Sequence, residues 1–133
     1  MILVDYREEK SGIFQILDDL KITYKKLSLE IADYIVVGNE GVNVAVERKT
    51  ASDYVSSLLS GHLNNQLTEL SRSFPFSFLL VEGSITEALF NSKTARQTVY
   101  SSLVGSAIKR SVDGCSGVIS IIPTDTIWIQ VYV

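Results

Sequence analysis

Short apolar runs that alternate with longer amphipathic stretches constrain the fold of this chain more than any other feature of its sequence. Five runs have the length and the β-branched or aromatic content of strands: 2–4, 31–37, 42–46, 76–81 and 118–122. Four stretches carry apolar residues at helical spacing: 9–20, 50–59, 62–71 and 94–109. Strands interleaved with helices predict a mixed α/β domain.

Three further features refine this outline. Residues 22–29 alternate loosely between polar and apolar and favour another strand. Pro123 is expected to end the strand at 118–122, because proline cannot donate a backbone hydrogen bond to a sheet. Residues 127–133 are compatible with a strand, an interface segment or the start of a helix.

Size and composition exclude several classes of protein. We expect one domain over residues 1–133, since the chain contains no repeat and no linker-like segment. Cys115 is the single cysteine, which excludes an internal disulfide and a cysteine-based zinc site. The P-loop pattern GxxxxGK[ST] is missing, so no nucleotide cofactor is expected.

The same inspection addresses location and nucleic-acid binding. No stretch is apolar for long enough to span a bilayer, and Asp5 comes too early for a signal peptide. We therefore expect a soluble, intracellular protein without a membrane partner, in the cytoplasm or nucleoid of a prokaryote or the nucleus of a eukaryote. A net charge of −3 excludes a protein that coats nucleic acid simply by being basic.

The clearest chemistry follows a predicted hairpin. Gly38-Asn39-Glu40-Gly41 has the composition of a turn and joins the strands at 31–37 and 42–46. Glu47 and Lys49 are two residues apart near the end of the second strand, so both side chains leave the same face. A carboxylate beside an ammonium group suits metal-assisted phosphodiester hydrolysis: the carboxylate helps to hold a divalent ion, and the lysine orients water or stabilises charge on the phosphate.

Asp33, on the first strand of this hairpin, is the candidate second carboxylate. An even-numbered loop places Asp33 opposite Val46 and turns it away from Glu47. A three- or five-residue loop, or one bulged residue, brings Asp33 and Glu47 to one face. The metal-site hypothesis therefore predicts an odd-numbered loop or a bulge.

Four segments of the chain resemble a known family. Asp33, then Glu47-Arg48-Lys49, then Asp53 resembles the signature of the XPF family of structure-specific endonucleases, which reads Gly-Asp, a spacer, Glu-Arg-Lys, three residues and Asp. The other three segments follow the order of the family: Val4-Asp5-Tyr6-Arg7-Glu8, Gly61-His62-Leu63-Asn64-Asn65-Gln66 and Leu79-Leu80-Val81-Glu82-Gly83. The resemblance extends over most of the chain.

This resemblance implies a restriction-endonuclease-like fold, with a central mixed β-sheet flanked by helices. It implies cleavage of branched DNA, such as 3′ flaps and forks, with Mg²⁺ or Mn²⁺ as cofactor, in DNA repair or recombination. The implied metal ligands are Asp33, Glu47, Glu8 and the backbone carbonyl of Arg48. The implied catalytic residues are Asp33, Glu47, Lys49, Asp5 and Asp53, and the implied DNA contacts are Arg7, His62 and Gln66.

The sequence departs from the family pattern in three ways. Ala32 stands where the family usually has glycine, and His62 stands where arginine is usual, which removes a permanent charge near the expected site. A tandem helix-hairpin-helix domain, which many members carry after the nuclease domain, has no counterpart in these residues.

Several of these residues also have purely structural interpretations. Asp5-x-x-Glu8 and Thr50-x-x-Asp53 both match helix capping patterns. Glu47 and Lys49 could form the solvated face of a strand. Arg48 points to the opposite face, which favours packing or ion pairing for its side chain, and Arg7 and Glu8 are expected to form a local ion pair or to line the cleft beside Asp5.

Alternative functions stay open at this level. One is a non-catalytic DNA-binding or dimerisation scaffold of the same family; another is a Holliday-junction resolvase or a restriction-type nuclease. We also expect a homodimer through the C-terminal half, including residues 127–133, and a partner protein that tethers the domain to DNA. The proposed site holds five of the fifteen acidic residues, so the rest of the chain carries twelve basic residues against ten acidic ones. The negative net charge therefore fits an enzyme that binds DNA weakly on its own.

Overall fold

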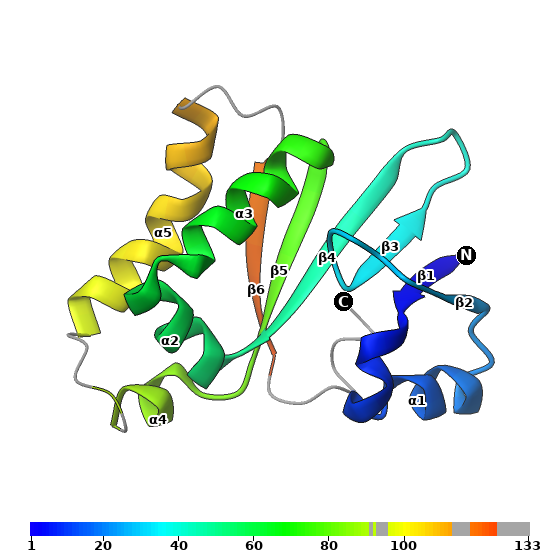
Figure 1. Ribbon diagram of the computed structural model, residues 1–133, viewed down its shortest axis with the longest axis horizontal. Coiled ribbons are helices and arrows are strands. Elements are labelled where there is room, and N and C mark those ends of the chain that lie inside the picture. The colour runs from blue at the N-terminus through cyan, green and yellow to red at the C-terminus, as the bar shows by residue number, and fades with distance from the viewer. Residues whose placement is uncertain (91, 93–95, 113–117, 125–133) are drawn as a thin grey trace.

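The computed structural model describes residues 1–90, 92, 96–112 and 118–124, and within them a six-stranded sheet forms the centre of the molecule (Figure 1). The N-terminal elements are β1 (Ile2–Asp5), the 3-10 helix η1 (Tyr6–Ser11), α1 (Ile13–Asp19), β2 (Tyr24–Leu27), β3 (Tyr34–Val37) and β4 (Asn43–Thr50). The C-terminal elements are α2 (Ala51–Ser60), α3 (His62–Ser73), β5 (Phe76–Glu82), α4 (Ile85–Phe90), α5 (Arg96–Val112) and β6 (Val118–Thr124).

The sheet is mixed, in the strand order β2-β1-β3-β4-β5-β6. β3 runs antiparallel to both β1 and β4, whereas the pairs β1–β2, β4–β5 and β5–β6 are parallel. Helices α2 and α3 connect β4 to β5, as a parallel pair requires. This topology places the carboxyl ends of β1, β4 and β5 and the amino end of β3 at the same end of the sheet.

Successive side chains along each strand point to opposite faces of the sheet, and each face carries its own hydrophobic core. Ala45 on β4 and Leu79 on β5 belong to the larger core, with residues of α2, α3 and α5. Val4 and Tyr34 point to the opposite face and pack with residues of α1. In Figure 1, α2, α3 and α5 lie together beside β5 and β6, and α1 lies beside β1. Since Glu47 has the same parity as Ala45, it leaves the sheet on the face covered by α2 and α3.

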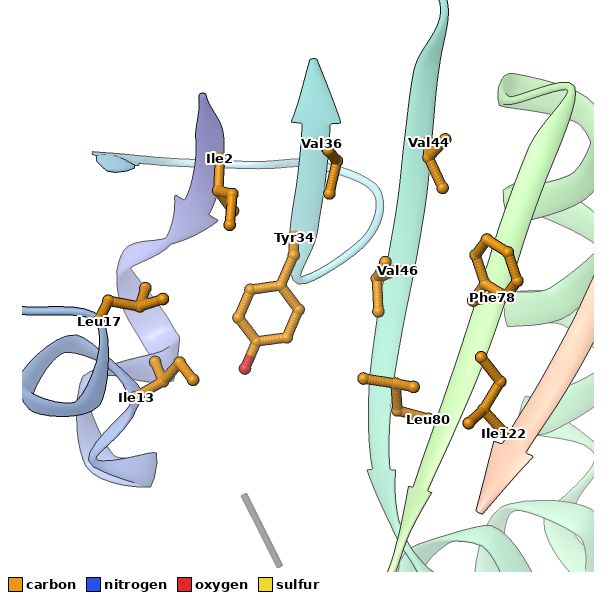
Figure 2. Close-up of a pocket in the computed structure, with 10 residues that line it drawn as sticks. All are labelled: Ile2, Ile13, Leu17, Tyr34, Val36, Val44, Val46, Phe78, Leu80 and Ile122. Atoms are coloured by element: carbon orange, nitrogen blue, oxygen red, sulfur yellow. The ribbon is translucent and has the colours of Figure 1, made fainter. Parts of the chain in front are cut away.

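A pocket on the α1 face is lined by side chains from α1 and from five of the strands (Figure 2). Among the described residues that line it, Tyr34 alone has a polar side-chain group, so the described lining is almost entirely apolar.

The N-terminal half corrects two of the predicted element boundaries. The helix predicted at 9–20 begins at Ile13, because the preceding residues form η1 and Gly12 separates the two helices at φ 82. The strand predicted at 31–37 begins at Tyr34, because Ala32 adopts the left-handed conformation at φ 74.

The C-terminal half adds α4, which the sequence did not predict, and extends β6 through Pro123 to Thr124. Proline is tolerated there because β6 lies at the edge of the sheet, where a missing donor leaves no neighbouring strand unpaired. Cys115 and residues 127–133 lie outside the described residues. No helix in the described part of the chain is both long and apolar enough to cross a membrane.

Candidate active site

Asp33 and Glu47 lie close together at the end of the β3–β4 hairpin that is far from its loop. The ladder pairs Tyr34 with Val46 and Val37 with Asn43, so residues 38–42 form a five-residue loop. The odd-numbered loop that the metal-site hypothesis requires is therefore confirmed. The ladder ends at the Tyr34–Val46 pair, and the Asp33 amide still donates to the Val46 carbonyl at 3.0 Å, so Asp33 lies beside β4 immediately beyond the last pair, next to the peptide that leads into Glu47.

A backbone hydrogen bond anchors the Asp33 carboxylate beside β4. Its Oδ2 accepts from the Arg48 amide at 2.7 Å. The Asp33 carboxylate thus lies next to the peptide that joins Glu47 to Arg48. This contact fixes one of the two carboxylates relative to the strand that carries the other.

Both carboxylates have a raised pKa in a half-buried environment. Burial is the main cause that raises the pKa of Asp33 to about 6, and the charges of Glu8 and Asp5 add to it. Burial and the charge of Asp33 raise the pKa of Glu47 to about 7, against the opposing charge of Lys49. Two half-buried carboxylates with raised pKa values are suited to a cation between them, since a cation would stabilise both charged forms.

The donor set fits a hard divalent ion. Asp33 and Glu47 provide two carboxylates, and Mg²⁺ is typically held by one or two carboxylates together with water and substrate oxygens. Within the described ranges, no group of three or more His, Cys, Asp or Glu side chains is arranged to hold a metal ion. Any ligands beyond these two side chains would come from the backbone, such as the Arg48 carbonyl, from water or from substrate.

Glu8, an implied metal ligand, has protein partners on the α1 side of the sheet. Its Oε2 accepts a hydrogen bond of 2.5 Å from the Tyr34 hydroxyl and lies 3.8 Å from Nη1 of Arg48. The structure therefore does not group Glu8 with Asp33 and Glu47 as a third side-chain ligand, although its charge raises the pKa of both.

Asp5 is fully buried and acts as the N-cap of η1. It accepts hydrogen bonds from the Arg7 amide at 2.8 Å, from the Arg7 guanidinium at 2.8 and 3.0 Å, and from the Leu29 amide at 2.9 Å. The Arg7 guanidinium is the main cause that lowers the pKa of Asp5 to about 2.

The predicted ion pair between Arg7 and Glu8 is wrong, because Arg7 pairs with Asp5. The capping interpretation of Asp5 is confirmed.

Comparison with known proteins places this geometry in a family. The sequence pattern of the ERCC4 domain matches residues 4–115. This chain is an ERCC4 domain of the XPF family. The match covers most of the chain and all of the predicted site residues.

The relatives of this ERCC4 domain are nucleases by name. It is 40% identical over 86 residues to the 3′-flap repair endonuclease Xpf of Saccharolobus solfataricus, which covers 65% of this chain and 35% of that protein. It is 36% identical over 81 residues to the DNA repair endonuclease XPF of Mus musculus, which covers 61% of this chain and 8% of that protein. The matched region is thus about a third of the archaeal relative and under a tenth of the mouse one.

Solved structures share the fold of the ERCC4 domain. XPF from Aeropyrum pernix aligns with a TM-score of 0.82 at 25% identity, covering 99% of this chain and 61% of that one. The complex of that XPF with DNA aligns with a TM-score of 0.77 at 26% identity, covering 94% of this chain and 56% of that one. The restriction-endonuclease-like α/β fold implied by the sequence is confirmed.

The remaining predicted residues of the ERCC4 domain lie on or next to α2 and α3. Lys49 Nζ donates to Oε1 of Gln66 on α3 at 3.0 Å, which brings a predicted DNA contact against a predicted catalytic residue. Asp53 lies in the first turn of α2, where its amide donates to the Thr50 hydroxyl at 3.1 Å, so the capping interpretation of this segment is also confirmed. His62 is exposed at the start of α3, one helical turn before Gln66.

Sequence reasoning missed two residues that contact the site residues of the ERCC4 domain. Tyr34 donates to Glu8, and Glu82 on β5 accepts a hydrogen bond from the Arg48 guanidinium. The alternation of side chains along the strands could have revealed Glu82. Arg48 pairs with Leu80, and Glu82 lies two residues after Leu80, so the side chains of Arg48 and Glu82 leave the same face of neighbouring strands.

Proposed function

We propose that this ERCC4 domain is a divalent-metal-dependent endonuclease that hydrolyses phosphodiester bonds in branched DNA, with 3′ flaps and forks as the substrate class. The observation that carries the proposal is the position of the Asp33 carboxylate close to Glu47, with Lys49 two residues further along the same strand. The archaeal relative named as a 3′-flap repair endonuclease and the structural relative bound to DNA support the choice of substrate.

Each proposed role follows from the position of the residue. Asp33, Glu47 and the Arg48 carbonyl would hold Mg²⁺ or Mn²⁺, and the ion would supply Lewis-acid activation and charge neutralisation at the phosphate. Lys49 orients the attacking water or the scissile phosphate, and the Gln66 oxygen holds its ammonium group in place. Asp53, in the first turn of α2, would orient Lys49 or a hydrated metal ion.

The remaining contacts shape the cleft and bind DNA. Asp5 fixes η1 and the loop at Leu29 through its hydrogen bonds. The side chain of Arg7 is 62% exposed, so it can contact a DNA phosphate while it pairs with Asp5. The exposed His62 provides a second phosphate contact. A homodimer through the C-terminal half and a DNA-tethering partner protein belong to the same proposal.

The direct test uses four forms of the protein: wild type, Asp33→Ala, Lys49→Ala and the control Lys25→Ala, an exposed lysine on β2. With Mg²⁺ and a 3′-flap substrate, we expect cleavage by wild type and Lys25→Ala, and a loss of at least about 10³-fold in Asp33→Ala and Lys49→Ala. Circular dichroism verifies that the variants are folded. Persistent cleavage by both site variants would refute the assignment.

Two further measurements separate the alternatives. Comparing a flap, a four-way junction and plain duplex distinguishes a flap endonuclease from a junction resolvase and from a restriction-type nuclease. A wild-type protein that binds branched DNA yet cuts none of these substrates with Mg²⁺ or Mn²⁺ would be the non-catalytic scaffold instead. Light scattering at high concentration tests the dimer, and a strict monomer contradicts it.

A further inference from the structure

Four polar side chains meet on the α1 face of the sheet, at the strand ends that carry the site on the opposite face. Arg48 Nη2 donates to Oε2 of Glu82, and Arg48 Nη1 lies 3.8 Å from Oε2 of Glu8. That Glu8 oxygen also accepts the 2.5 Å hydrogen bond from Tyr34. Figure 2 shows the Tyr34 side chain projecting from the start of β3 on the face that also carries Val46. We call Tyr34, Glu8, Arg48 and Glu82 the arginine clamp.

The clamp is joined by the backbone to the proposed site. Tyr34 directly follows Asp33, and Arg48 stands between Glu47 and Lys49. The Arg48 amide donates to Asp33, and its carbonyl belongs to the peptide that precedes Lys49. The contacts of the clamp therefore restrain the residue whose backbone lies directly between Glu47 and Lys49.

The members of the clamp are largely shielded from water. The exposed fractions of the Glu8, Arg48 and Glu82 side chains are 12%, 19% and 19%. Burial raises the pKa of Tyr34, which keeps its hydroxyl protonated as the donor to Glu8. Among the described side chains, Nε of Arg48 is buried without a hydrogen-bond partner, so the guanidinium is held through its terminal nitrogens.

Such a cluster controls geometry more than stability. The cost of desolvating three charged groups offsets much of their attraction, so a partly buried ion-pair network contributes little net stability. Its planar, charge-assisted hydrogen bonds are nevertheless directional, and a guanidinium can reach two carboxylates at once. Glu8 and Glu82 come from η1 and β5, so the clamp ties β4 to elements on both sides of it.

We propose that Tyr34 and Glu82 are positioning residues for the proposed nuclease site: through Glu8 and the Arg48 side chain they fix the end of β4, and so hold the Glu47 carboxylate and the Arg48 carbonyl toward Asp33. This inference rests on the proposed function. It assigns to Tyr34 and Glu82 no contact with metal or DNA.

The test compares Tyr34→Phe and Glu82→Gln with two matched controls. Tyr24→Phe removes a hydroxyl whose hydrogen bond to Asp18 lies away from the site, and Glu40→Gln neutralises an exposed carboxylate in the hairpin loop. The first readout is hydrogen exchange of the Arg48 amide in the metal-free proteins. The second is kcat and KM for flap cleavage with Mg²⁺, measured beside the thermal midpoint of each variant.

We expect the Arg48 amide to exchange at least about tenfold faster in Tyr34→Phe and Glu82→Gln than in the controls. We also expect kcat to fall about 10–100-fold, as it does when groups that orient metal ligands are removed, with KM within about twofold of wild type. Amide exchange at the wild-type rate in both variants overturns the inference, whether or not the protein cuts DNA. Faster exchange with unchanged kcat also overturns it. Wild-type protein that shows the protected amide but does not cut DNA contradicts the proposed function instead.

Discussion

Asp33 lies close enough to Glu47 for its charge to raise the pKa of Glu47, at the end of a hairpin in which five residues, not four, separate the paired positions Val37 and Asn43. Side chains alternate between the faces of a sheet, so one residue more or fewer in the loop would turn Asp33 toward α1 and leave Glu47 without a partner. The geometry of the candidate site thus depends on a loop at the far end of the hairpin.

Gly38 is the residue on which this loop depends most. A Cβ at Gly38 would lie 2.5 Å from the Val42 carbonyl oxygen, the same atom that accepts the hydrogen bond from the Gly38 amide. We expect Gly38→Ala to cost about 2 kcal/mol or more, because backbone has to move. A Cβ at Gly41 would have no atom within 4 Å. Gly41→Ala should therefore lower the free energy of unfolding by about 1 kcal/mol, through the φ of 77 alone. Urea unfolding measures both, and equal costs would contradict this account of the loop.

Ala32, which replaces the usual glycine of the family, adopts φ 74 immediately before Asp33. The left-handed conformation costs an alanine about 1–2 kcal/mol, which offsets what its buried methyl group contributes. We expect Ala32→Gly to change stability by less than about 0.5 kcal/mol. Ala45→Gly, in the same core but on a regular strand, should cost about 2 kcal/mol. A similar loss in both variants would show that Ala32 is not strained.

Glu47 should make the metal-free protein less stable in alkaline solution. Its pKa is raised from 4.5 to about 7, so the folded state binds more protons than the unfolded state between these values, and stability falls as the pH rises through them. We expect Glu47→Gln to be more stable than wild type at pH 8, by an amount on the order of 1–3 kcal/mol, and the gap to close toward pH 4.5.

Adding Mg²⁺ provides the control for the Glu47 experiment. The ion should raise the thermal midpoint of wild type at pH 8 and leave that of Glu47→Gln nearly unchanged, since binding to the folded state alone stabilises it. An equal rise in both proteins would place the bound ion away from Glu47.

Asp5 should have the opposite pH dependence. Its pKa is lowered from 3.8 to about 2, so the stability it contributes is fully present above pH 3.8 and is lost as the pH falls through 2. We expect Asp5→Ala to cost about 2–4 kcal/mol at pH 7, because the cap and its other hydrogen bonds are lost. The gap to wild type should narrow below pH 3. A gap that is constant from pH 7 to pH 2 would contradict the role of its charge.

The sequence predicted most of what local pattern determines. Every strand in the described part of the chain was predicted, five from apolar runs and β2 from a loose alternation of polar and apolar residues. The placement of Asp33 relative to Glu47 depended on whether the loop between the two strands is odd or even in length. The helix α4 has six residues, too few for a periodic pattern, and the passage of β6 through Pro123 depends on its place at the sheet edge. The arginine clamp joins η1, β3, β4 and β5, so no local pattern could reveal it.

The most direct test of the central claim is anomalous diffraction from a crystal of the protein soaked in Mn²⁺. We predict a manganese peak between the carboxylates of Asp33 and Glu47 and within coordination distance of the Arg48 carbonyl, and no such peak in Asp33→Ala crystals. A fully soaked wild-type crystal without a peak at this position, or with its manganese bound elsewhere, would contradict the claim that these residues form a metal-dependent nuclease site.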